Sequence, residues 1–248
     1  MQYANPPVHP PANVFHRTFD SPLAGHEIGY NIYLPPDYTS SGRRYPVFYH
    51  LHGWTGSESS EIEPMARICQ SRDAITVFPN LSLPVDDPEH FPIELVIIDE
   101  LIPYIDREYR TQADRAHRGI SGFSMGGGMA FYYAVKYPEL FSSVTAYAGT
   151  YHHYYDQGFL TVDAAPERAG ELRELILKGE NVSEKNILHL LNRQAEVIRD
   201  HLHITLHVGT ADILYCDNEI MHLHLDLLGI PHEYRRFNGA THVLDSIL

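Results

Sequence analysis

A strand-like run that leads into a glycine-rich turn and then a helix-like run constrains this chain more than any other feature. The turn is Gly122-Phe123-Ser124-Met125-Gly126, with an apolar run over 116–121 before it and a helical pattern over 125–137 after it. Glycines around a serine permit a sharp turn in strained torsions that brings the hydroxyl into the open. A helix starting at Met125 would offer free N–H groups to a developing oxyanion. The pattern predicts a nucleophilic Ser124 or, more simply, a turn that packs a helix closely on a sheet.

Strand-like and helix-like runs alternate along the rest of the 248 residues. We expect strands over 28–34, 45–52, 74–78, 116–121, 142–148, 204–208 and 233–237. Helical spacing covers 61–70, 92–109, 125–137, 167–177, 184–200 and 218–228, while residues 1–14 read as a proline-rich extended arm. This alternation predicts an α/β fold with a mostly parallel central sheet and helices on both faces. We expect a single domain over 1–248, with a small lid-like insertion around 150–200.

A nucleophilic serine needs a base and a residue that orients the base, and in such a sheet both lie at the carboxyl ends of strands. Among 17 histidines, His242 directly follows the last expected strand, and Asp212 follows strand 204–208 in the same way. Asp217 and Glu219 compete with Asp212 but read as charges in the first turn of a helix. The chain order Ser124, Asp212, His242 is the order that hydrolases of this architecture use. We therefore predict these three residues as a catalytic triad.

Two further features complete the predicted site. The loop His52-Gly53-Trp54-Thr55-Gly56 follows strand 45–52, so the N–H groups of Trp54 and Met125 are the expected oxyanion donors. Aromatic residues gather after strand 142–148, and we expect Trp54, Tyr151, Tyr154 and Tyr155 to contact substrate, for example a planar phenolic acyl group. The alternative is that these tyrosines form the core of a lid.

Composition excludes several classes of partner. The net charge is −14, with 18 basic residues and no basic run, so we expect no nucleic-acid partner. No apolar stretch approaches the length of a membrane span. The N-terminal arm lacks the parts of a signal peptide, which favours a cytoplasmic protein, with a secreted mature form as the alternative. Cys69 and Cys216 read as free thiols, with a single disulfide between them as the alternative. The sequence leaves open whether the protein forms a homo-oligomer.

The motifs resemble the esterase D / feruloyl esterase group of α/β hydrolases, which is similar to carbohydrate esterase family 1. The resemblance rests on the loop 52–56, the block 122–127, the corner Gly209-Thr210-Ala211-Asp212 and the end Gly239-Ala240-Thr241-His242, and it covers about residues 15–245. It implies the α/β-hydrolase fold, Ser124 as nucleophile, His242 as base and Asp212 as its orienter. The chain ends soon after His242, where relatives usually carry a closing helix. The segment between Pro79 and Phe91 is short, which predicts an open cleft.

The resemblance leaves the substrate open, because its members share the machinery and differ in their pockets. We expect hydrolysis of feruloyl, hydroxycinnamoyl or short acyl esters of sugars through an acyl-enzyme, without a cofactor. The alternatives are an S-formylglutathione hydrolase-like thioesterase, an acyltransferase with the same triad, and a non-catalytic binding protein that happens to keep all three residues.

A metal hydrolase is the rival chemistry. His222-Leu223-His224-Leu225-Asp226 superficially matches a dinuclear zinc motif. Residues two apart on a helix point to different sides, however, and only 22 residues remain for the missing ligands. We therefore expect no catalytic metal.

Overall fold

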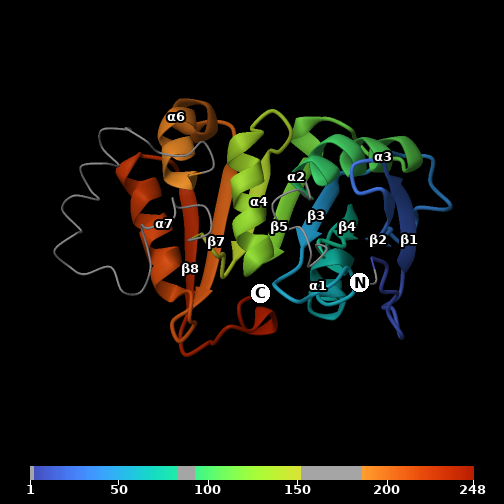
Figure 1. Cartoon of the computed structure of the whole chain (residues 1–248), viewed down its shortest axis with the longest axis horizontal. Helices are drawn as coiled ribbons and strands as arrows, with labels where there is room; N and C mark the ends of the chain where they lie inside the picture. The colour runs from blue at the N-terminus through green and yellow to red at the C-terminus, as the bar shows by residue number, and fades with distance from the viewer. Residues whose placement is uncertain (1–2, 83–92, 152–185) are drawn as a thin grey trace.

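An eight-stranded sheet forms the centre of the computed structural model, which describes residues 3–82, 93–151 and 186–248. The strand order is β1-β2-β4-β3-β5-β6-β7-β8 (Figure 1). Strand β2 runs antiparallel to both of its neighbours, and every other neighbouring pair is parallel. The strands are β1 (Val14–Ser21), β2 (His26–Tyr33), β3 (Val47–Leu51), β4 (Ile75–Pro79), β5 (Arg118–Phe123), β6 (Ser143–Tyr147), β7 (His203–Gly209) and β8 (His232–Phe237). The predicted mostly parallel sheet is confirmed.

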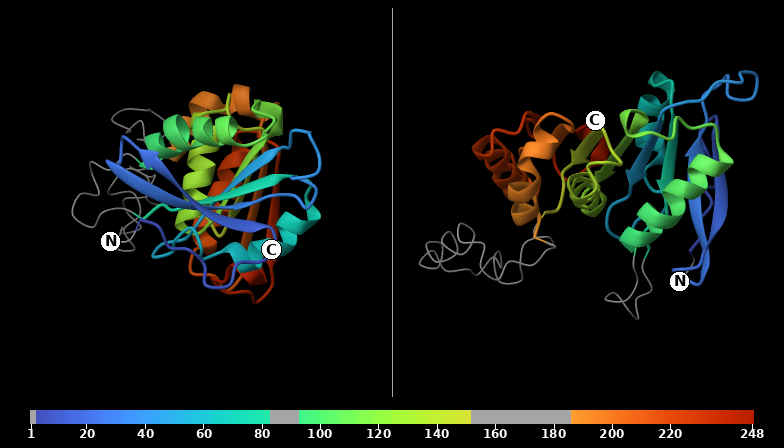
Figure 2. Two further views of the ribbon diagram at one scale, coloured as in Figure 1. Left: turned by 90° about the vertical axis from the view of Figure 1, so that its right-hand side faces the viewer. Right: turned by 90° about the horizontal axis from the view of Figure 1, so that it is seen from above.

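Helices cover both faces of this sheet (Figure 2). One face carries α3, α4, α6 and α7, whose apolar side chains share the larger core cluster with strand residues such as Tyr49 and Leu51 of β3. The other face carries α1 and the C-terminal segment, which share a smaller cluster with Phe78 and Val208. The helices are α1 (Ile62–Ser71), α2 (Ile93–Leu95), the π-helical turn η1 (Val96–Leu101), α3 (Ile102–Glu108), the 3-10 turn η2 (Arg115–His117), α4 (Met125–Lys136), α6 (Ile187–Arg199), α7 (Tyr215–Leu227) and the 3-10 turn η5 (Leu244–Ser246).

Strand β1 is the element that the sequence pattern missed. It lies at the edge of the sheet and pairs only with β2. Its sequence, VFHRTFDS, mixes charged and apolar residues, and only three of its eight residues are buried. An edge strand of this kind buries too little apolar surface to give a clear alternating signal.

The helix predicted over 92–109 is present, but a π turn interrupts it. The N–H of Ile102 bonds the carbonyl of Ile97, five residues back, where an α-helix would reach four. Pro103 explains the interruption, because it has no N–H to donate and its ring crowds the carbonyl four residues before it. Helix α7 begins at Tyr215, three residues before the predicted start. The helix predicted over 167–177 lies outside the described residues, and the lid-like insertion largely does so too, so the single-domain assignment stays a prediction.

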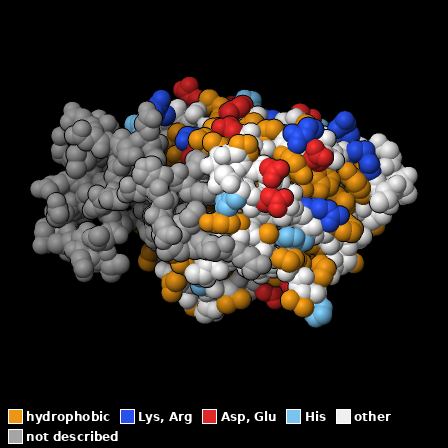
Figure 3. Space-filling view, turned by 45° about the vertical axis from the view of Figure 1, so that its right-hand side comes forward, with side chains coloured by type: hydrophobic (Ala, Val, Ile, Leu, Met, Phe, Trp, Pro, Cys, Tyr) orange, Lys and Arg blue, Asp and Glu red, His pale blue; other side chains and the backbone are white. Residues whose placement is uncertain are grey.

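The structure also bears on the expectations about membrane spans, surface charge and the two cysteines. Within the described ranges, no helix combines the length and apolarity that a bilayer span requires. Acidic and basic side chains are intermixed on the face drawn in Figure 3. Cys69 is buried and Cys216 is exposed, and both thiols are free.

Glycine packing brings the start of α4 onto the end of β3. A Cβ atom at Gly126 would lie 2.0 Å from the carbonyl oxygen of Leu51 and 2.6 Å from that of His52. A Cβ atom at Gly122 would lie 2.3 Å from the carbonyl oxygen of Gly126. Only hydrogen fits at these two positions, and the close approach places the residue between β5 and α4 at the carboxyl edge of the sheet.

Substitution of Gly126 tests this packing. We expect Gly126→Ala to lower the free energy of unfolding by about 2–4 kcal/mol, because backbone carbonyls that cannot rotate away must move to admit the methyl group. The matched control is Gly42→Ala, where nothing lies within 4 Å of the added Cβ, and we expect a change below about 0.5 kcal/mol. Urea denaturation of both variants measures the difference. Equal stability of the two variants would contradict the packing argument.

Candidate active site

Ser124 occupies the turn between β5 and α4 in a strained conformation. Its backbone has φ 56° and ψ −118°, a region that non-glycine residues rarely adopt. Three backbone hydrogen bonds hold it there: its N–H donates to the carbonyl of Tyr147 at 2.8 Å, and its carbonyl accepts from the N–H groups of Gly128 and Thr150, both at 3.0 Å. The surrounding structure therefore fixes the direction of the Ser124 side chain.

The structure brings Ser124, His242 and Asp212 together, as the sequence predicted. Nε2 of His242 lies 2.9 Å from Oγ of Ser124, and Nδ1 lies 2.9 and 3.0 Å from the two carboxylate oxygens of Asp212. An ionised carboxylate only accepts hydrogen bonds, so it selects the tautomer that carries hydrogen on Nδ1. Nε2 is then free to accept the hydroxyl hydrogen of Ser124. The Asp212 side chain is fully buried, and its Oδ1 also accepts the N–H of Leu214 at 2.7 Å.

Backbone hydrogen bonds join the loops that carry the acid and the base. The N–H of Ala211 donates to the carbonyl of Ala240 at 3.0 Å, and the N–H of Gly239 donates to the hydroxyl of Thr210 at 2.9 Å. Gly209 permits this contact, because a Cβ there would lie 2.1 Å from the Ala240 carbonyl oxygen. Asp212 and His242 are thus positioned relative to each other by main-chain contacts as well as by their own hydrogen bond.

The short C-terminal segment packs behind His242. The His242 ring stacks on Phe123, with 4.7 Å between ring centroids. After it, Leu244 and Ile247 are buried, and Nδ1 of His207 in β7 donates to the Ile247 carbonyl at 2.6 Å. These contacts hold the segment after His242 against β7.

The loop after β3 forms a tight turn beside Ser124. The N–H of Gly56 donates to the carbonyl of Gly53 at 3.0 Å, and Thr55 has a φ of 62°. A Cβ at Gly53 would lie 3.4 Å from Cβ of Ser124, so the two residues are close neighbours. The turn thus places Trp54 next to the end of β5, at the side where the sequence predicted an oxyanion donor.

Buried polar residues fix this turn, and the sequence reasoning missed their role. One carboxylate oxygen of Glu61 accepts the N–H of Gly53 at 2.8 Å, and the other lies 2.8 Å from Nε2 of His50. Nδ1 of His50 in turn lies 2.9 Å from the hydroxyl of Ser121 in β5. Glu61 therefore connects the turn to the centre of the sheet. A glutamate just before a helix, opposite a strand histidine, was the available signal.

His52 holds the carbonyl of the same residue, Gly53. Its Nε2 accepts the N–H of Leu81 at 2.9 Å, so Nδ1 carries the hydrogen and donates to the Gly53 carbonyl at 2.8 Å. Burial lowers the pKa of His52 below its ordinary value, which keeps the ring neutral in this arrangement. His50 in β3 and His52 just after it are thus held by buried hydrogen bonds that reach the predicted oxyanion loop.

The structure corrects one predicted substrate contact. Tyr151 is fully buried, and its ring meets Phe131 of α4 edge to face, with 5.5 Å between ring centroids. Tyr151 therefore belongs to the core. The hydrogen bond from the N–H of Thr150 to the carbonyl of Ser124 holds the preceding residue against the start of α4 and directs the chain inward. Trp54, by contrast, is 74% exposed beside the turn. Tyr154 and Tyr155 lie outside the described residues.

Comparisons with known proteins agree with this architecture. A solved "ferulic acid esterase" superposes with a TM-score of 0.75 at 24% identity, covering 94% of this chain and 92% of that one. An S-formylglutathione hydrolase from Staphylococcus aureus gives a TM-score of 0.73 at 16% identity, with 93% and 92% covered. Likeness at this level of identity shows the α/β-hydrolase-type fold.

Sequence relatives are closer but partial. "Esterase Rv1288" of Mycobacterium tuberculosis is 33% identical over 143 residues, which are 53% of this chain and 31% of the relative. An "Endo-1,4-beta-xylanase/feruloyl esterase" of Xylanibacter ruminicola is 32% identical over 151 residues, or 52% of this chain and 20% of the relative. The matched part thus spans a third or less of these relatives' own length.

A family model covers more than half of the chain. The Esterase model, described as "Putative esterase", matches residues 88–243, a stretch that contains Ser124, Asp212 and His242. The resemblance read from the motifs is confirmed at this level: the chain belongs to the Esterase family.

Proposed function

We propose that this protein is a serine carboxylic-ester hydrolase that works through an acyl-enzyme. The observation that carries the proposal is the continuous hydrogen-bonded chain from Ser124 Oγ through His242 to the buried carboxylate of Asp212. A nucleophile within 2.9 Å of a base, whose tautomer a buried acid fixes, meets the geometric requirements for acyl transfer. Membership of the Esterase family supports the same chemistry.

The proposed reaction proceeds in two halves. Ser124 Oγ attacks the ester carbonyl while His242 Nε2 takes the hydroxyl proton, and Asp212 stabilises the imidazolium that forms. His242 then gives this proton to the leaving alcohol, and the acyl group remains on Ser124. In the second half, water attacks the acyl carbonyl while His242 takes its proton. The bond between the acyl group and Ser124 Oγ then breaks, His242 returns the proton to Oγ, and the acid leaves.

The backbone of Trp54 and Met125 supplies the proposed oxyanion hole. The Gly53 carbonyl is held by the His52 ring and by the N–H of Gly56, and in a trans peptide the N–H of Trp54 points the opposite way. Met125 is the first residue of α4, so its N–H has no partner within its own helix. Two fixed N–H groups beside Ser124 would stabilise the charge that develops on the substrate oxygen.

Feruloyl, hydroxycinnamoyl or short acyl esters of sugars are the proposed substrates. Relatives named as feruloyl esterases support the phenolic acyl group. In this chain, the exposed Trp54 ring is the described aromatic surface beside the proposed oxyanion hole, and a planar acyl group could stack on it. The fold is also shared with S-formylglutathione hydrolases, so a thioester substrate or an acceptor alcohol in place of water is the competing assignment. A panel of feruloyl, acetyl, aryl and S-formylglutathione esters, assayed with and without acceptor alcohols, separates these cases.

Loss of the Ser124 hydroxyl tests the chemistry directly. We expect Ser124→Ala to reduce kcat by about 10^4- to 10^6-fold on any ester that the wild type hydrolyses, because no nucleophile remains. A fluorophosphonate probe should add one adduct to the wild type, located on Ser124 by peptide mass spectrometry, and none to the variant.

The matched control is Ser40→Ala, a substitution of an exposed serine far from the turn. It should keep wild-type kcat and wild-type labelling. Ester hydrolysis that survives in Ser124→Ala, or an adduct on another serine, would rule out the proposed nucleophile.

Glu61 provides a test of the oxyanion hole. We expect Glu61→Gln to lower kcat about tenfold or more with little change in KM, because an amide group cannot accept hydrogen bonds at both ends and the Gly53 turn shifts. Affinity for a trifluoromethyl ketone, which forms a tetrahedral oxyanion on the serine, should fall in parallel. Glu63→Gln, an exposed change on the same helix, is the control. If fluorophosphonate titration shows normal kcat per active site in Glu61→Gln, the residue has only a folding role.

A further inference from the structure

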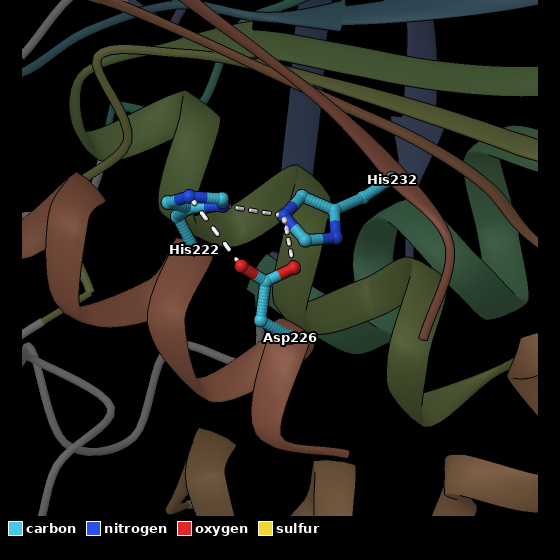
Figure 4. Close-up of side chains that lie close together, drawn as sticks. All are labelled: His222, Asp226 and His232. Atoms are coloured by element: carbon cyan, nitrogen blue, oxygen red, sulfur yellow. Dashed lines mark hydrogen bonds and ion pairs between the residues drawn. The ribbon is translucent and has the colours of Figure 1, made fainter. Parts of the chain in front are cut away.

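Two histidines and an aspartate converge where α7 meets β8, far along the chain from Ser124. His222 and Asp226 lie on successive turns of α7, and His232 is the first residue of β8 (Figure 4). Nδ1 of His222 lies 2.7 Å from Nε2 of His232. The carboxylate oxygens of Asp226 lie 3.6 Å from Nε2 of His222 and 4.0 Å from Nε2 of His232. One donor atom from each residue falls within 4.8 Å of the other two.

The histidine of β8 is prepared as a donor. Its Nδ1 donates to the carbonyl of Ile230 at 2.9 Å, which leaves the lone pair of Nε2 directed at His222 and Asp226. A backbone carbonyl on the far nitrogen is the usual way in which proteins fix the tautomer of a metal-binding histidine. The side chain of His232 is only 3% exposed, so its orientation is held by packing. The His222 ring is likewise held, by stacking on Tyr234 at 4.4 Å between centroids.

The charged and histidine side chains next to His222, Asp226 and His232 are occupied by other contacts. Glu219, the next acid on this side of α7, is engaged by the hydroxyl of Tyr234 at 2.8 Å and by Arg236 at 3.0 Å. His224 points elsewhere and lies against Leu188 of α6. The cluster therefore uses only the first histidine of the His-x-His motif that the sequence contains. The Asp226 side chain is 59% exposed, so an ion can enter from solvent.

We propose that His222, Asp226 and His232 form a zinc site. Two imidazoles and one carboxylate make a donor set that zinc commonly takes, with water as the fourth ligand. Two nitrogens bound to a tetrahedral zinc at about 2.0–2.1 Å lie about 3.3 Å apart. Only one nitrogen of His222 can bind the ion. With Nδ1 as that ligand, its 2.7 Å hydrogen bond to Nε2 of His232 must open to this value, and the Asp226 oxygen that lies 4.0 Å from Nε2 of His232 must move closer. Rotations of the His222 and Asp226 side chains would make both changes.

The place of the site in the fold makes its role structural. His232 is at the first residue of β8, whereas the loop with His242 leaves the other end of that strand. Zinc there would join the C-terminal half of α7 to the start of β8, the two elements that follow Asp212 and precede His242. The site thus acts independently of the proposed ester chemistry, and chelation should leave the chemistry of Ser124 unchanged.

Zinc binding to the untagged, chelator-treated protein tests the proposal. By isothermal titration calorimetry we expect a zinc equivalent that is lost or weakened at least about tenfold in both Asp226→Asn and His222→Gln. The control His203→Gln removes a histidine that is 67% exposed at the start of the adjacent strand, and it should bind like the wild type. Zinc at about 100 times its Kd should raise the Tm of the wild type and of the control by about 5 °C and leave Asp226→Asn unchanged.

Cobalt(II) substitution reports on the ligands themselves. The wild type should show the intense visible absorption of a four-coordinate site, and the two site variants should not. Asp226 is exposed on a helix, so Asp226→Asn keeps the fold, and its metal-free Tm verifies this. Zinc stoichiometry, affinity and Tm that are the same in the wild type and Asp226→Asn would overturn the site, whatever the result of the esterase assays.

Discussion

The close contact between Gly126 and the carbonyls at the end of β3 is the constraint on which the rest of the proposed site depends. It lets α4 start directly over the carboxyl edge of the sheet, and the turn at Ser124 must then adopt a positive φ. Strain of this kind persists only when neighbouring structure over-determines it, as the three main-chain bonds of Ser124 do here. Backbone packing, and not any contact of the hydroxyl group, therefore determines where the Ser124 side chain points.

The same packing places the proposed nucleophile Ser124 next to the loop after β3. Gly53 lies beside Ser124, and Glu61 and His52 bind the N–H and the carbonyl of Gly53 from within the protein. Their donors and acceptors are matched in a place without bulk water, where such hydrogen bonds are strong and errors in their pairing are costly. The turn that carries the proposed oxyanion donor Trp54 is thus connected to the sheet through Glu61 and His50.

The three residues of the proposed triad could be predicted from the sequence. The rule that sites form at the carboxyl ends of parallel strands needs only the position of each strand and the order of the strands along the chain. Ser124, Asp212 and His242 each follow a recognisable strand, and parallel strands bring those ends to one edge. Glu61 carried only a weak signal, a glutamate at the start of an expected helix, because its role depends on contacts with Gly53 and His50 that the order of elements does not reveal. Tyr151 was placed wrongly because an aromatic-rich composition does not say which way the chain turns. β1 was missed because an edge strand with polar residues lacks a clear alternation.

Elements α7 and β8 show how one pair of structural elements can serve two separate purposes. Asp212 precedes α7 and His242 follows β8, so the distance between acid and base depends on how this helix lies on this strand. At the carboxyl edge, the main-chain bond from Ala211 to Ala240 fixes that relation. At the other end, main-chain bonds from Gly229 to Asp226 and from Ile230 to Leu225 close the turn that leads from α7 to β8. The paired histidines flank this turn, so an ion bound at the proposed site would add a side-chain link between the helix and the strand to the link that the backbone already makes.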